Sequence, residues 1–128
     1  MMTTRAIDNV EHCRSMEDVR RNIDALDDIL VPLLVTRGGY MTQAARIKQD
    51  AHQVRDEERI ESIVARVRER AVQEGGEADV VEAIYRSMME AYIAYEHREF
   101  ARLRSSADQG APPADAAAAT AAADHAPR

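Results

Sequence analysis

The amino-acid sequence predicts an all-α protein with three helices in each subunit. Three observations support this fold class. Charged residues make up 31% of the 128 residues, aromatic residues only 4%, and there is no Trp, a composition typical of helical proteins when it is combined with helical periodicity. Apolar residues recur at spacings of three and four, as on one face of a helix. The two-residue alternation that indicates a strand is absent, so we expect no β-sheet.

The first helix is expected over residues 16–49. Ser15 and Asp18 match the capping box that often begins a helix. Pro32 costs about 3 kcal/mol inside a helix. The apolar pattern nevertheless continues past it, so we predict one long helix with a kink at Pro32. The apolar stripe consists of Val19, Ile23, Leu26, Leu30, Leu33 or Leu34, Met41, Ala44 and Ala45.

Two further helices are expected over residues 56–74 and 80–103. Gly75 and Gly76 should end the second helix, and Asp79 is placed to cap the third. Residues 1–14 are interpreted as a flexible lead-in, and residues 15–104 as the helical domain. Residues 105–128 are expected to be a disordered tail, because residues 107–128 contain eleven alanines and three prolines and almost nothing to bury.

The unequal lengths of these helices predict a homodimer. The first helix would be about 50 Å long at 1.5 Å per residue. Much of its apolar stripe would therefore remain exposed in a monomer, and exposed apolar surfaces of that size usually mark interfaces.

Composition argues against several classes of function. The net charge is −6 and the sequence has no basic stripe, so we expect no nucleic-acid partner. No apolar run approaches the roughly 20 residues of a membrane span. Residues 1–10 do not resemble a signal peptide, and the cytoplasm is the expected location. Cys13 is the only cysteine, which excludes an internal disulfide. The four histidines lack ligand spacing, so we expect no metal.

Two cations stand on the apolar face of the first helix. Arg37 occupies a position of the stripe where an apolar residue is due, and Lys48 follows three turns later on the same face. A buried charge is costly unless it is paired. Either acidic side chains of the protein or an anionic ligand must therefore meet Arg37 and Lys48.

Other polar residues extend this candidate site. Arg20 precedes Arg37 by 17 residues, about 26 Å along one helix, so it reaches a shared small ligand only from the partner of an antiparallel dimer. Asp56 and Arg59 are neighbours on the second helix. Glu96 lies on a mostly apolar face of the third helix.

Four segments in this order resemble the all-helical chorismate mutase family, which includes a branch of isochorismate-pyruvate lyases. The segments are VRRNIDALDDILVPLL, TRGGYMTQAARIK, VRDEERIESIVARV and MMEAYIAYE. The resemblance covers about residues 10–103 and implies an intertwined homodimer. It also implies two sites, each completed by an arginine of the partner, and chemistry without a cofactor.

The resemblance implies a role for each basic residue of the site. Arg20 from the partner and Arg37 from the same subunit would bind the carboxylates of a dianionic substrate. Lys48 would contact a carboxylate and the ether oxygen of the breaking bond, and Arg59 would support the carboxylate side. Arginine suits carboxylates because its guanidinium donates two parallel hydrogen bonds.

The resemblance also implies roles for two acidic residues. Asp56 would face the ring hydroxyl of the substrate. Glu96 stands where most mutases have a glutamine that donates to the ether oxygen. A carboxyl group donates only when it is protonated, so we expect activity to decline as the pH rises through neutrality.

Two positions of the substrate pocket depart from the mutase pattern. Ile60 stands where mutases often have a glutamate that touches the substrate hydroxyl, and Tyr92 replaces a common serine. Both residues are as in the lyase branch, whereas Asp56 matches the mutases better. Of the two activities of this family, we expect that of a chorismate mutase, which forms prephenate. An isochorismate-pyruvate lyase that forms salicylate and pyruvate, and a non-catalytic helical dimer that binds such dianions, are the alternatives.

Overall fold

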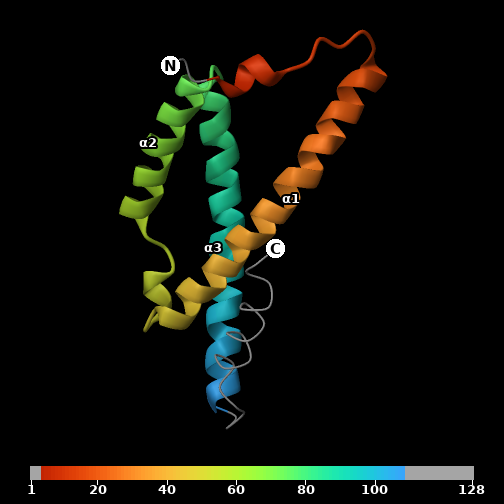
Figure 1. The fold of residues 1–128 in the computed structure, drawn as a ribbon. Helices are drawn as coiled ribbons and strands as arrows, with labels where there is room; N and C mark the ends of the chain where they lie inside the picture. The colour runs from red at the N-terminus through yellow and green to blue at the C-terminus, as the bar shows by residue number, and fades with distance from the viewer. Residues whose placement is uncertain (1–3, 109–128) are drawn as a thin grey trace. The chain divides into compact units, whose positions relative to one another are not determined.

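The computed structural model of the protein describes residues 4–108 (Figure 1). Within this range the chain forms three α-helices, two short 3₁₀ helices and no strand, which confirms the predicted all-α fold with three helices. In chain order the elements are η1 (Ala6–Asn9), α1 (Met16–Ile47), η2 (Ala51–Gln53), α2 (Glu57–Gln73) and α3 (Ala78–Asp108).

Helix α1 begins at the predicted cap. The Asp18 backbone N–H donates to Ser15 Oγ at 3.1 Å, and the Asp18 carboxylate in turn accepts from the Arg14 backbone N–H at 3.1 Å. The helix continues through Pro32 and ends at Ile47, two residues earlier than expected. Pro32 therefore does not break the helix, while the kink that we expect there stays a prediction.

The described residues form two compact units, and α1 and α3 contribute to both. The first unit contains Met1–Arg37 and Asp56–Ala91, and the second contains Gly38–Arg55 and Tyr92–Arg128, of which residues 4–108 are described.

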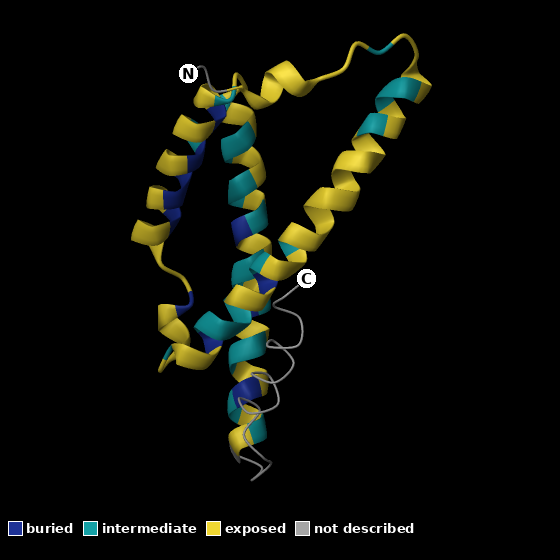
Figure 2. Ribbon diagram, in the orientation of Figure 1, coloured by how far each residue is buried: buried dark blue, intermediate teal, exposed yellow. Residues whose placement is uncertain are grey.

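In the first unit, α2 buries one face and forms an antiparallel pair with the beginning of α3. Arg68, near the end of α2, pairs with Asp79 at 2.9 Å and with Glu82 at 2.6 Å. Glu61, near the start of α2, pairs instead with Arg86, one turn further along α3, at 3.0 Å. The buried side of α2 (Figure 2) has the spacing of one helix face and consists of Ile60, Ile63, Val64, Val67 and Ala71.

The N-terminal segment is anchored to the end of α2, although we expected a loose lead-in. The Ile7 and Ala6 backbone N–H groups donate to the Glu74 backbone oxygen at 3.1 Å and to Glu74 Oε1 at 2.8 Å. Gly75 has a φ of +82°, and a methyl group added to it would lie 2.4 Å from Ile7 Cγ2. Only glycine suits both the left-handed turn and this close contact.

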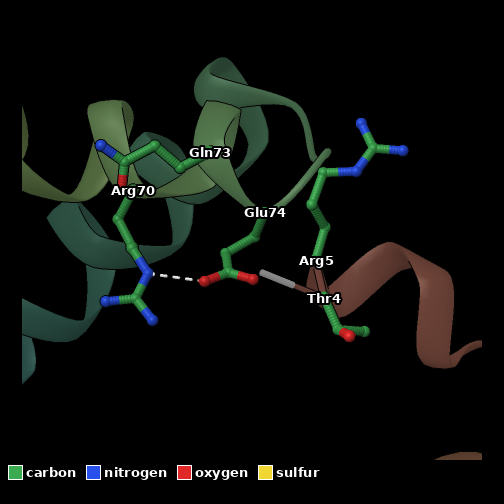
Figure 3. A pocket seen from close by; sticks show the side chains of 5 residues that line it. All are labelled: Thr4, Arg5, Arg70, Gln73 and Glu74. Carbon is green, nitrogen blue, oxygen red and sulfur yellow. Dashed lines mark hydrogen bonds and ion pairs between the residues drawn. The ribbon is translucent and has the colours of Figure 1, made fainter. Parts of the chain in front are cut away.

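A small pocket accompanies this anchor (Figure 3). Arg70 Nε donates to Glu74 Oε2 at 2.7 Å inside it, so these two charges neutralise each other. The pocket contains none of the predicted site residues. It is lined by Thr4, Arg5, Arg70, Gln73 and Glu74.

In the second unit, the end of α1 packs on the second half of α3. Helix α3 continues to Asp108, beyond residue 104, where we expected the helical domain to end. Leu103 is buried, and Arg104 is bonded to backbone carbonyls of α1, so α3 still makes contacts in the second unit at the point where we expected it to end. The remainder of the expected tail, residues 109–128, lies outside the described residues.

Candidate functional site

A buried ion pair joins Lys48 to Glu96 in the second unit. Lys48 Nζ donates to Glu96 Oε2 at 2.7 Å and lies 3.4 Å from the Val54 backbone oxygen. The Glu96 side chain is only 4% exposed, and the Lys48 side chain is 26% exposed. The sequence left two explanations for Lys48, an acidic side chain of the protein or an anionic ligand. The structure shows an acidic side chain, that of Glu96. Part of the Lys48 side chain is nevertheless accessible to solvent.

The backbone fixes where Lys48 stands. Its N–H donates to the Ala44 oxygen at 3.0 Å, so Lys48 directly follows the last turn of α1. Lys48 is also the only lysine in the sequence, next to sixteen arginines. The ammonium group of lysine is a compact charge on a flexible stem, whereas the guanidinium group of arginine is planar and holds its donors in a fixed geometry.

An arginine that sequence analysis did not select caps the same end of α1. Arg104 Nη1 donates to the Ala45 backbone oxygen at 2.7 Å, and Nη2 donates to the Lys48 backbone oxygen. The guanidinium carbon lies 3.8 Å from the centroid of the Phe100 ring. Glu96, Phe100 and Arg104 are four residues apart, a spacing that places them on one face of a helix. Because the third helix was expected to end at residue 103, Arg104 was not assigned to that face.

Tyr92 precedes Glu96 by one turn of α3 and lies against Gly38 of α1. A methyl group added to Gly38 would be 3.1 Å from Tyr92 Cε1, closer than an ordinary carbon–carbon contact. The ring of Tyr92 also meets that of Tyr95 edge to face, with centroids 6.5 Å apart and an interplanar angle of 76°. Gly38 therefore makes room for the Tyr92 ring.

A polar network holds Tyr95 in place. The hydroxyls of Thr42 and Tyr95 are 3.1 Å apart, and both donate to Glu99 Oε1, at 2.9 Å and 3.3 Å. Arg102 donates to both carboxylate oxygens of Glu99, at 2.7 Å and 3.1 Å. These bonds, from Arg102 above all, hold the pKa of Glu99 below its usual value against the opposing effect of burial. An ionised Glu99 keeps both hydroxyls oriented.

Arg37 and Arg20 both lie on α1 within the first unit. Arg37 is half-buried and Arg20 is exposed. Because α1 is unbroken between them, their separation of 17 residues corresponds to about 26 Å. They do not meet around one small ligand within a subunit, as expected. That Arg20 enters the site of a partner stays a prediction.

Asp56 begins α2 in the first unit. Asp56 Oδ1 accepts from the Arg59 backbone N–H at 3.0 Å, so Asp56 caps α2. Both side chains are exposed, whereas Ile60 lies in the buried face of the helix. This cap accounts for the position of the Asp56 side chain. The substrate contacts expected for Asp56, Arg59 and Ile60 stay predictions.

Residues 4–108 contain no group of three His, Cys, Asp or Glu side chains able to hold a metal ion. Over the same residues, none of the helices has both the length and the apolar character that a membrane span requires.

The chain belongs to the type II chorismate mutase family, whose family model matches residues 19–97, more than half of the sequence. The match includes the end of α1 with Lys48, the start of α2 with Asp56, and Glu96 of α3. A comparison with curated proteins found no match.

We expect Gly38→Ala and Gly39→Ala to have different effects, although both glycines lie in α1. Among the described residues, a methyl group added to Gly39 meets no atom within 4 Å. Gly39→Ala should therefore raise the free energy of unfolding by about 0.5–1 kcal/mol through helix propensity. Gly38→Ala should gain less or lose stability, because the methyl group displaces Tyr92. Urea unfolding of both variants measures the difference, and equal gains would contradict the proposed packing of Tyr92.

Proposed function

We propose that the protein catalyses the rearrangement of chorismate to prephenate. The observation that carries the proposal is the Lys48–Glu96 pair, a partly accessible cation against a buried carboxylate, on a chain of the chorismate mutase family. The reaction is an isomerisation in which one C–O ether bond breaks and one C–C bond forms. It needs no nucleophile, metal or cofactor.

Lys48 is proposed to act on the breaking bond. When the substrate binds, the ammonium group donates to a carboxylate and to the ether oxygen. Negative charge grows on this oxygen as the C–O bond lengthens, and a donor already in place stabilises that charge without reorganisation. In the protein alone, Glu96 accepts from Lys48 as a carboxylate. When a substrate carboxylate replaces it as the counter-charge of Lys48, Glu96 takes up a proton from solvent and donates to the same ether oxygen.

The arginines are proposed to hold the substrate in its reactive conformer. Arg37 of one subunit and Arg20 of the partner bind the two carboxylates, and Arg59 supports this side of the site. Asp56 faces the ring hydroxyl. Holding the reacting carbon atoms together in this way removes much of the entropic part of the barrier.

A specific observation favours a second candidate, the isochorismate-pyruvate lyase. Ile60 is buried and apolar, and the Tyr92 ring fills the space beside Gly38. The resemblance to the family implies that mutases often have a glutamate at the position of Ile60 and a serine at that of Tyr92. An apolar side chain at Ile60 suits a substrate that needs no polar contact at its ring hydroxyl.

The proposal includes a homodimer, because α1 exposes a continuous apolar stripe in the first unit. Five of its large apolar side chains are between 49% and 64% exposed, namely Ile23, Leu26, Ile29, Leu30 and Leu33. Burying such a stripe against a second copy removes it from water and brings Arg20 to the partner's site. We further propose that the dimer works in the cytoplasm, without nucleic acid or membrane as partner.

Incubation with chorismate and with isochorismate, followed by identification of the products, tests the proposed activity. We expect prephenate from chorismate. Salicylate and pyruvate from isochorismate would establish the lyase instead, and binding without any product would establish a non-catalytic dimer.

Lys48→Met should lower kcat/KM by about 10²–10³-fold, the usual cost of losing a donor to the developing charge. Because this change leaves Glu96 buried without its partner, the double variant Lys48→Met/Glu96→Gln separates loss of fold from loss of chemistry. It should be folded and equally inactive. Arg46→Met, which removes an exposed cation two residues away, should retain the wild-type rate. Wild-type activity in folded Lys48→Met would exclude the proposed role.

Glu96→Gln should flatten the dependence of kcat/KM on pH. The wild-type rate should fall as the pH rises, because only the protonated carboxyl group donates, whereas an amide donates at every pH. Measurement from about pH 5 to about pH 9 compares the two slopes. Glu99→Gln, a change one turn away on the same helix, should keep the wild-type slope. Coincident profiles of wild type and Glu96→Gln would remove Glu96 from the mechanism.

Mixing two inactive variants tests whether Arg20 acts across a dimer. Dissociation and reassociation of Arg20→Ala with Lys48→Met should create heterodimers that have one intact site. In an equal mixture with random pairing, about one quarter of the wild-type activity should return. Arg21→Ala serves as the control, since Arg21 pairs with Asp18 at 2.9 Å, and it should be active without mixing. No recovery on mixing would show that Arg20 does not complete the partner's site.

A further inference from the structure

The last turn of α1 is held by a side chain from α3. The final carbonyls of an α-helix have no N–H partner within the helix and must find one elsewhere. Arg104 supplies two donors, one to the Ala45 oxygen at 2.7 Å and one to the Lys48 oxygen. A cation at this position also faces the negative end of the helix dipole. Arg104 therefore caps the turn from which Lys48 projects.

The guanidinium group of Arg104 is itself fixed. Its central carbon lies 3.8 Å from the centroid of the Phe100 ring, one turn earlier on α3. This is the geometry of a cation–π contact. Leu103, the preceding residue, is buried in the second unit. The fork of Arg104 is thus restrained by stacking before it meets the carbonyls of α1.

Helix α3 consequently holds Lys48 at both ends. Glu96 accepts from the ammonium group at 2.7 Å, and Arg104, eight residues later in the same helix, donates to the backbone carbonyl of Lys48. The four-carbon stem between these points is flexible. Because the backbone of Lys48 is fixed, its ammonium group can reach only the positions that rotation within the side chain allows.

We propose that Arg104 is a positioning residue for Lys48. The inference rests on the proposed function, in which the Lys48 ammonium stabilises the ether oxygen. Without the cap, the last turn of α1 frays and the ammonium samples positions away from the breaking bond. A displacement of about 1 Å in a reacting geometry can cost about 10²-fold in rate. Arg37 and Arg20 of the partner still bind the carboxylates, whereas the donor to the developing charge is misplaced, so kcat should fall by much more than KM rises.

The single lysine gives a direct test by nuclear magnetic resonance. Protein labelled with ¹⁵N-lysine shows one backbone amide signal from lysine, that of Lys48, whose N–H bonds the Ala44 oxygen at 3.0 Å. In Arg104→Met we expect this amide to exchange with solvent at least about 10-fold faster than in wild type, because an uncapped turn opens more often. The matched control is Arg98→Met, which removes an exposed arginine from the same helix and should leave the exchange rate unchanged.

Turnover of chorismate by the same proteins completes the test. Arg104→Met should lose about 10- to 100-fold in kcat with KM within about 3-fold. Arg98→Met should match wild type. Arg104→Lys, measured for turnover alone, should be intermediate because one ammonium group serves fewer carbonyls. If Arg104→Met does not fold, Phe100→Leu removes the stacking contact instead and should show the same two effects in weaker form.

The two readouts separate this inference from the proposed function. Unchanged amide exchange and unchanged kcat in folded Arg104→Met would overturn the inference while turnover by the wild type upholds the function. Faster exchange with unchanged kcat would also overturn it, because the contact would then be structural alone. Wild-type protein without turnover would overturn the proposed function, and the exchange rates would still show whether Arg104 holds Lys48.

Discussion

The pairing of one cation with one buried carboxylate constrains the second unit more than any other contact. Removing either partner from such a pair leaves an uncompensated buried charge, which costs about 3–5 kcal/mol. A well-packed apolar pair is often at least as stable as the ion pair it replaces. The Lys48–Glu96 contact is therefore weak evidence for a role in stability, which agrees with the proposed action of the ammonium group on a substrate.

That pairing accounts for features of the fold around it. Lys48 reaches Glu96 only if α1 ends at the right residue and α3 passes beside that end. The Val54 carbonyl and the Arg104 guanidinium both contribute to this arrangement from outside α1. The Thr42–Tyr95–Glu99 network joins the same two helices on the side of Tyr92. Polar contacts of defined geometry, rather than apolar burial alone, thus set how these two helices pack.

The local parts of the fold were predictable from sequence, and the parts that depend on distant contacts were not. Ser15 caps α1 as expected and the buried face of α2 has helical spacing, although α3 begins at Ala78, before its expected cap at Asp79. These features depend on neighbours in the chain. The bonds of Arg104, near the end of α3, depend instead on carbonyls at the end of α1 that lie 56 and 59 residues earlier in the chain. Sequence reasoning selected Lys48 and Glu96 separately, and the structure pairs them. The substrate contacts proposed for Arg20, Asp56 and Arg59 depend on a ligand and a second subunit rather than on neighbours within the chain.

The occurrence of a single lysine beside sixteen arginines has a practical consequence. Reagents that acylate or alkylate amines ignore guanidinium groups under ordinary conditions, so apart from a terminal amine their target in this chain is Lys48. Coupling the protein to a surface through amines, or cross-linking it with amine-reactive reagents, would modify the candidate site itself. Attachment through the Cys13 thiol would avoid that site.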